Sequence, residues 1–295
     1  MSSKVWILKL SLNLSSGIRR WLAFGLAFCA LSGVGNPLVI KFVSAQAQDQ
    51  NRVAAQSKFD EGEALQKQGT TESLRSALKK YEEALPLWRS VNDRAKEAET
   101  LHNIGYVYNS LLEMQKALNY LNQALTLYRK AGDRRGEANV LNTIGGIYGS
   151  LGENRKALDF YNRALPLWRA AGDSSGEAKT LDNMGFVSIL LGEKQKALDY
   201  LNQALPLLRA AGDRRREAEM LDHIGFVYYS LGEKQKALDF YNQELPLRRA
   251  AGDSSGEAKT LNNIGDVYDS LGEKQKALDF HNQAAEVSAR SRRPF

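Results

Sequence analysis

The sequence predicts an all-α fold, a solenoid of about six stacked helix-turn-helix units. From residue 98 onward the chain restates itself every 40 residues, because five similar segments, the first of them LHNIGYVYNSL, begin at residues 101, 141, 181, 221 and 261. A fixed period of this length is typical of stacked supersecondary units. The composition is that of a folded helical protein, with 43% hydrophobic and 25% charged residues and six prolines. We therefore expect neither a disordered chain nor a polytopic membrane protein.

The first 47 residues predict a signal peptide. A basic stretch ends in Arg19 and Arg20, an apolar run follows from Trp21 to Val34, and small residues come before Gln48. This order is that of an export signal, and we expect cleavage after Ala47 or Ala45.

The same segment also allows a membrane anchor. The stretch from Trp21 to Ile40 is roughly twenty residues, long enough to span a bilayer if it is not removed. The basic residues that precede it should stay cytoplasmic, so the repeats are expected outside the cytoplasm in either case. The repeats are expected to be periplasmic or extracellular, and to meet a membrane only through this segment.

The net charge of the chain is concentrated in the leader. The charge is +6, and the first 47 residues hold five bases and no acid, which leaves 6 − 5 = +1 for the rest. A nearly neutral body offers no basic stripe for phosphates, so nucleic acid is not expected as a partner. The only cysteine, Cys29, also lies in the leader. A mature chain would have no disulfide and no cysteine metal site.

The first helix of each unit has an apolar stripe. Leu221, Ile224, Gly225 and Tyr228 follow the i, i+3, i+4, i+7 spacing of one helix face. A glycine inside a helix costs about 1 kcal/mol against alanine, so its recurrence predicts a packing role. We expect small side chains of the second helix to meet it. The glycine column is Gly105, Gly145, Gly185, Gly225 and Gly265.

The second helix of each unit repeats the pattern KALDFYNQALPL, with one alanine column at residues 117, 157, 197, 237 and 277. Four prolines at residues 86, 166, 206 and 246 share a column in its second half. The apolar spacing continues beyond them, which favours a kinked helix over a helix that ends before the proline.

The connections carry helix-terminating residues. Glycines at 152, 192, 232 and 272 suit the left-handed position after a helix, and aspartates at 133, 173, 213 and 253 suit an N-cap. Ser174 with Glu177, and Ser254 with Glu257, also have the spacing of a capping box.

The ends of the array are expected to be atypical. Residues 48–94 predict the first unit, with helices starting near Ala54 and Ser76 and a longer link between them. Residues 95–290 hold five forty-residue units, and residues 291–295 are expected to be a disordered tail. Ser288 stands where earlier units carry a large apolar side chain, which predicts a polar cap.

These columns resemble the tetratricopeptide repeat. Leu221, Ile224, Gly225 and Tyr228, then Gly232, Ala237 and Tyr241, stand in the order of that motif, and the resemblance covers residues 52–290. It implies a right-handed superhelical solenoid that binds proteins. The forty-residue length is similar to the subgroup in kinesin light chains, in a G-protein regulator of spindle orientation and in many bacterial proteins. The chain departs from the motif at Leu112, Ser188, Glu244 and His281.

No catalytic, metal or cofactor site is indicated. His102, His223 and His281 lie in different units without ligand spacing, and the glycines at 145–152 lack a following Gly-Lys-Ser/Thr. Bacterial arrays of this subgroup often precede a CHAT domain, a caspase-like peptidase module. Residues after 290 leave no room for one, so we do not expect an enzyme.

Peptide binding is the expected function of the first-helix positions that do not face the second helix. In the resembled family such positions line a concave groove, and asparagines there hold a peptide backbone, because an amide both donates and accepts hydrogen bonds. One such column reads Asn103, Thr143, Asn183, His223 and Asn263, and its neighbour reads His102, Asn142, Asp182, Asp222 and Asn262.

Other positions of the same face differ from unit to unit and predict specificity. They suggest an apolar centre in the fourth and fifth units beside an acidic end, suited to a peptide with apolar anchors and a basic residue. The alternative is that these aromatic side chains pack against the adjacent unit. The predicted peptide-binding residues here are Tyr106, Asn109, Phe186, Ile189, Phe226, Tyr229, Asp266 and Asp269.

The sequence thus predicts an extracytoplasmic scaffold that binds a protein or peptide ligand. Two alternatives stay open: the regulatory partner of a separately encoded peptidase or kinase, and a membrane-anchored structural spacer. The sequence indicates no oligomeric state.

Overall fold

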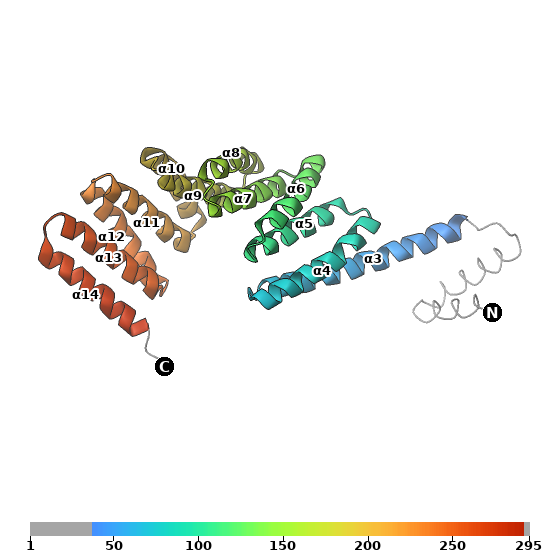
Figure 1. Ribbon diagram of the computed structural model, residues 1–295, viewed down its shortest axis with the longest axis horizontal. Coiled ribbons are helices and arrows are strands. Elements are labelled where there is room, and N and C mark those ends of the chain that lie inside the picture. Colours follow the sequence, from blue (N-terminus) through green and yellow to red (C-terminus); the bar gives the residue numbers. More distant parts are fainter. Residues whose placement is uncertain (1–36, 292–295) are drawn as a thin grey trace, which may run out of the picture. The chain divides into compact units, whose positions relative to one another are not determined.

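The computed structural model describes residues 37–291, and this stretch is folded into twelve helices, α3 to α14 (Figure 1). Most of the leader expected at residues 1–47 lies outside the described residues. The helices are α3 (Pro37–Gln66), α4 (Thr71–Ser90), α5 (Arg94–Ser110), α6 (Met114–Ala131), α7 (Arg134–Ser150), α8 (Asn154–Ala171), α9 (Ser174–Leu190), α10 (Lys194–Ala211), α11 (Arg214–Ser230), α12 (Lys234–Ala250), α13 (Ser254–Ser270) and α14 (Lys274–Ser291).

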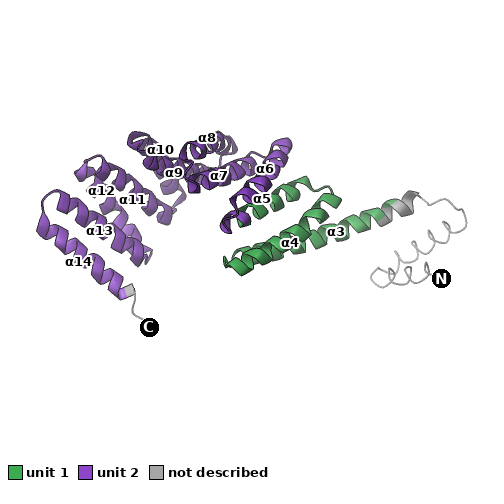
Figure 2. Ribbon diagram, viewed as in Figure 1, with its two compact units in different colours: residues 1–107 green, residues 108–295 purple. Residues whose placement is uncertain are grey.

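Consecutive helices pair into six repeats, which confirms the predicted solenoid. We number the repeats in chain order, from repeat 1 (α3 and α4) to repeat 6 (α13 and α14). The two helices of a repeat pack on each other in repeats 1, 3, 4, 5 and 6. The chain divides into two compact parts, residues 1–107 and 108–295 (Figure 2). In the second part each second helix also packs on the first helix of the next repeat, as α8 does on α9 and α12 on α13.

The N-caps are the predicted aspartates. The Asp133 carboxylate accepts from the Gly136 amide at 2.9 Å, and Asp173 accepts from Gly176 at 2.9 Å. The predicted capping box is wrong, because Ser174 lies inside α9 and Asp173 occupies the cap. Glu177 instead accepts from Arg169 of the preceding helix.

Arginine–glutamate pairs of this kind connect the repeats. An arginine near the end of each second helix donates through Nε to a glutamate in the first turn of the next first helix. Such a pair stabilises the start of the helix, where a negative charge is favoured. The pairs are Arg89–Glu97 (2.7 Å), Arg129–Glu137 (2.6 Å), Arg169–Glu177 (2.7 Å), Arg209–Glu217 (2.8 Å) and Arg249–Glu257 (2.7 Å).

The turns inside the repeats use the predicted left-handed glycines. Gly152, Gly192 and Gly232 have φ of 73°, 74° and 79°. Leu112 has to adopt the same conformation, with φ 62°, although its side chain makes this unfavourable.

The column glycines of α7, α9, α11 and α13 lie against large side chains, which corrects the predicted contact with alanine. A Cβ on Gly145 would be 2.6 Å from Cε1 of the Tyr161 ring, and one on Gly185 would be 2.6 Å from Cδ2 of Leu201. The missing side chain makes room for a ring or a leucine that crosses between the paired helices. Gly62 of α3 has the same contact with Tyr81, at 2.7 Å, so repeat 1 shares the framework.

The prolines of the second helices lie inside them. The helices α4, α8, α10 and α12 each continue past their proline, so the alternative of an early helix end is wrong. A bend at each proline stays a prediction.

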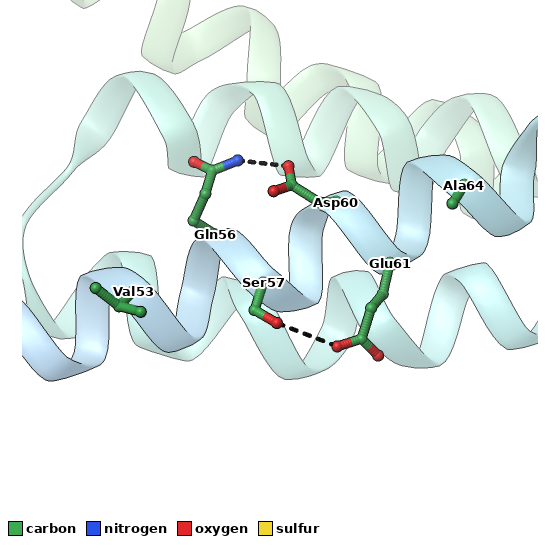
Figure 3. A pocket seen from close by; sticks show the side chains of 6 residues that line it. All are labelled: Val53, Gln56, Ser57, Asp60, Glu61 and Ala64. Atoms are coloured by element: carbon green, nitrogen blue, oxygen red, sulfur yellow. Dashed lines mark hydrogen bonds between the residues drawn. The ribbon is translucent and has the colours of Figure 1, made fainter.

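Helix α3 begins at Pro37, well before Ala54, where the first helix was expected to start. One of its faces forms a shallow pocket lined by six side chains, with Ser57 bonded to Glu61 at 3.3 Å (Figure 3). Aligned on the framework glycine, Glu61 corresponds to Ile224, which is fully buried. A polar residue such as Glu61 at this position is expected on the outer face of a terminal repeat, which caps the array. Among the described helices, none combines the length and apolar character needed to cross a bilayer.

Candidate peptide-binding face

The first helices of neighbouring repeats lie side by side in residues 108–295. Helix α9 contacts both α7 and α11, in addition to its own second helix. Side chains that point away from the second helices therefore form one continuous surface over α7, α9, α11 and α13. We call it the candidate face and define it by Thr143, Gly146, Asn183, Phe186, Ile189, His223, Phe226, Tyr229, Asn263, Asp266 and Asp269.

Two phenylalanines form the apolar centre of the candidate face. Phe186 is 47% exposed and Phe226 is 48% exposed, far more than the buried leucines of the same helices. The Phe186 and Phe226 rings are therefore open and not buried against the neighbouring repeat. Peptide binding by these rings stays a prediction. Phe186 does touch that repeat at its edge, because its ring centroid is 6.0 Å from that of His223.

His223 connects repeats 4 and 5 beside Phe186. Its Nδ1 lies 3.1 Å from Asp182 Oδ1, and both side chains are about one-third exposed. Burial lowers the pKa of His223, but the hydrogen bond and charge of Asp182 outweigh it, so the pKa lies above the usual 6.5. Asp182 thereby fixes the ring orientation and favours the imidazolium form.

The same link recurs between repeats 5 and 6. Asp222 is buried, and its Oδ1 accepts from Asn263 Nδ2 at 2.9 Å while its Oδ2 accepts from Lys259 Nζ at 2.7 Å. Asp182 and Asp222 thus each form a hydrogen bond with the residue 41 positions later in the chain, His223 and Asn263 respectively. The Nδ2 group of Asn263 is therefore already engaged in a hydrogen bond within the protein.

Asn142 lies in the interior of the protein. It is 7% exposed, its Nδ2 donates to Thr180 Oγ1 at 2.8 Å, and its Oδ1 lies 3.1 Å from the same hydroxyl oxygen. The structure therefore separates Asn142 from the candidate face, whereas Asn183 is half-buried on it. The continuous asparagine ladder suggested by the sequence is interrupted here.

The last repeat supplies the acidic end of the candidate face. The side chains of Asp266 and Asp269 are 59% and 52% exposed. Asp269 pairs with Lys274 at 2.7 Å, and Asp266 lies 3.7 Å from His281 Nε2. Asp266 is the more available of the two for a cationic ligand.

The predicted residues of the second repeat lie on both sides of the boundary between the compact parts. In residues 1–107, Asn103 Nδ2 lies 3.5 Å from the Tyr81 hydroxyl, and Tyr106 is 46% exposed. Asn109, in residues 108–295, is half-buried.

Sequence reasoning missed the roles of Asp182, Asp222 and Lys259. All three hold neighbouring repeats together at the candidate face. The signal was present in the sequence, since each aspartate precedes its partner by one repeat period plus one residue. Within residues 37–291 no cluster of histidine, cysteine, aspartate and glutamate could hold a metal ion.

A family model described as the tetratricopeptide repeat matches residues 62–130, 136–210, 176–250 and 216–290, more than half of the chain. This chain belongs to the tetratricopeptide repeat family. No match is found among curated protein sequences.

Several solved structures share the fold of this chain. BtubC (BKLC) from P. vanneervenii has a TM-score of 0.67 at 20% identity, over 79% of this chain and 94% of that one. A putative kinesin light chain with nearly identical TPR-like repeats from Podosopora anserina has a TM-score of 0.57 at 14% identity, over 66% and 97%. A Rap protein complexed with competence and sporulation factor has a TM-score of 0.57 at 18% identity, over 79% and 74%.

Proposed function

We propose that this tetratricopeptide repeat protein is a scaffold that binds a peptide or an unstructured protein segment on the candidate face. The observation that carries the proposal is the pair of half-exposed phenylalanines, Phe186 and Phe226, on adjacent first helices. Exposed aromatic side chains on a rigid surface are typical anchors of a protein interface. The Rap protein that shares this fold was solved in complex with competence and sporulation factor, which supports a binding function.

The chemistry of the face suggests which peptide it takes. Apolar anchors of the ligand would pack on Phe186 and Phe226, and amides such as that of Asn183 could bond its backbone. A lysine or arginine of the ligand would lie toward Asp266, which is exposed at the end of the face. An opposite charge there favours association and fixes the direction of the peptide.

A displayed peptide library selected on the full-length protein tests this proposal. We expect enrichment of peptides with apolar anchors and a basic residue. The double variant Phe186→Ala and Phe226→Ala should bind them about tenfold more weakly or worse, as expected for buried aromatic anchors. Replacing Asp266 by asparagine should weaken the binding of only those peptides that carry the basic residue.

A matched control comes from the second helices of the same two repeats. Asn202 and Asn242 are exposed on α10 and α12, and replacing both by alanine should leave binding unchanged. Thermal melting of each variant verifies that the fold is intact. Equal binding by the phenylalanine variant and the wild type, with both folded, would show that the ligand binds elsewhere.

We also propose that the repeats function outside the cytoplasm. The basic stretch that ends in Arg20, the apolar run after it and the small residues near Ala47 support this proposal. Sequencing the N-terminus of exported protein tests it. A start at Gln46 or Gln48 indicates a cleaved signal peptide, an intact N-terminus on membrane-bound protein indicates an anchor, and protein found only in the cytoplasm refutes export.

A further inference from the structure

Repeat 5 differs from the other repeats at two buried positions of α12. Glu244 occupies a column of alanines, and Arg248 occupies a column of large apolar side chains. The corresponding alanines are Ala84, Ala124, Ala164, Ala204 and Ala284, and the large side chains are Trp88, Tyr128, Trp168 and Leu208. A charged pair therefore replaces part of the apolar core where repeat 6 packs on repeat 5.

The two residues form a buried ion pair with one unsatisfied oxygen. Arg248 Nε donates to Glu244 Oε1 at 2.9 Å, and Arg248 Nη1 donates to Asp253 Oδ2 at 2.8 Å. Glu244 is fully buried and Arg248 is 9% exposed. The second oxygen of Glu244, Oε2, has no hydrogen-bond partner. An unpaired oxygen of a buried carboxylate is costly as long as the carboxylate is ionised.

The groups around Glu244 act on its ionisation in both directions. On α13, the Thr260 hydroxyl favours the ionised carboxylate, although it also bonds the Gly256 carbonyl at 2.8 Å. Asp222 of α11 adds a negative charge, and its own bonds go to Lys259 and Asn263. Tyr241, on α12 itself, is buried beside these acids.

The balance of these effects favours a proton on Glu244. Burial and the charge of Asp222 raise its pKa from 4.5 to about 7, although Arg248 and Thr260 oppose the shift. We call α13 and α14 docked when they pack on α12 and open when they do not. In the open state the Glu244 carboxyl is solvated and recovers its ordinary pKa. The docked state thus binds the proton more tightly than the open state. Docking is therefore strongest below pH 4.5, and this stabilisation is lost as the pH rises through about 7.

The chain contains an uncharged version of the same junction. Residues 245–261 repeat residues 165–181 except at one position, where Arg248 replaces Trp168. In both junctions a glycine of the next helix makes room for this side chain. A Cβ on Gly176 would be 2.4 Å from Cδ2 of Trp168, and one on Gly256 would be 2.6 Å from Cδ of Arg248.

We propose that protonation of Glu244 controls how firmly repeat 6 docks on repeat 5. The protonated side chain removes the buried negative charge and leaves Arg248 paired with Asp253. Ionisation, at pH above neutral, loosens α13 and α14. Docking itself is independent of the proposed function, but a consequence rests on it, because Asp266 of α13 forms the acidic end of the candidate face.

Hydrogen exchange of the full-length protein measures this docking. The protection factors of the amides between Leu261 and Tyr268, corrected for intrinsic exchange, should fall about tenfold between pH 5.5 and 7.5. The same region of α7, whose junction has no buried carboxylate in this column, serves as the internal reference. The double variant Glu244→Ala and Arg248→Trp copies the repeat 3 junction and should be insensitive to pH.

A second variant keeps the size of the side chain. Glu244→Gln cannot ionise, so its α13 protection should also be independent of pH. His223→Asn removes the titratable link to Asp182 of repeat 4 and should keep the wild-type response of α13. The proposal is overturned by a wild-type response equal to that of α7, or by the same response in both Glu244 variants. The hydrogen-exchange measurement involves no ligand, so a failed peptide selection would leave the docking proposal unaffected.

Discussion

Gly225 and Tyr241 are in direct contact across the paired helices of repeat 5. A Cβ on Gly225 would lie 2.6 Å from Cε1 of the tyrosine ring, closer than any real Cβ contact. The ring is rigid and almost fully buried, so it cannot turn away easily.

Replacing Gly225 by alanine should therefore destabilise the protein, although alanine is the better helix former. We expect a loss of about 1 to 3 kcal/mol from overpacking, measured by urea unfolding. The matched control is Gly149→Ala in α7, where a Cβ would be 3.9 Å from the nearest atom, the Ala157 Cβ. That variant should gain about 0.5 to 1 kcal/mol. Stabilisation by both substitutions would show that the tyrosine contact does not constrain the glycine.

Leu112→Gly should stabilise the protein. Leu112 has φ 62° and a side chain that is 77% exposed, so glycine relieves the left-handed strain with little loss of buried surface. A gain of about 1 kcal/mol is expected in thermal or urea unfolding. The reverse change, Gly152→Leu, places a leucine in the same conformation at the next turn and should cost a similar amount. A neutral result for both variants would contradict the strain at Leu112.

Asn154→Lys should strengthen the contact between repeats 3 and 4. Lys194 Nζ donates to the Ser230 carbonyl at 2.5 Å, and Lys234 binds the Ser270 carbonyl in the same way, in each case at the end of the next first helix. Asn154 occupies this column in repeat 3, and its Oδ1 is buried without a partner. A lysine there should reach the end of α9 and add about 0.5 to 1.5 kcal/mol. Lys194→Asn is the reciprocal variant and should lower the unfolding temperature, and an increase would refute this explanation.

The His223 pair predicts a pH-dependent contribution to stability. The folded pKa of His223 is raised above 6.5, so the stabilisation is complete below 6.5 and is lost as the pH rises through the folded value. An NMR titration of the His223 ring should show this raised pKa in the wild type. In Asp182→Asn the partner charge is absent and the pKa should fall. An unchanged titration in that variant would mean that Asp182 does not hold the imidazolium.

The repeat period was enough to predict the fold. The stripe of Leu221 and Ile224, the aspartate caps and the turn glycines depend only on local helix geometry, which the spacing of residues encodes. The partner of Gly225 was not predictable in this way, because it depends on how far the second helix is shifted along the first.

The candidate face was predicted only in part for a related reason. Exposure of Phe186 and Phe226 follows from the helix face on which they lie. The bonds of Asn142 and Asn263 depend on the rotation between successive repeats, which brings each of them beside a residue about one period away. That rotation results from the packing of many side chains, and no short motif encodes it.

The arginine–glutamate pairs between repeats have an evolutionary consequence. Because Arg129–Glu137, Arg169–Glu177 and Arg209–Glu217 join different repeats with the same geometry, this ion pair can form between the end of any one of these repeats and the start of another. A duplication or deletion of one 40-residue block would leave every remaining junction with its arginine and its glutamate. The length of the array can therefore change by whole repeats in a single genetic event while this ion pair is kept at every junction.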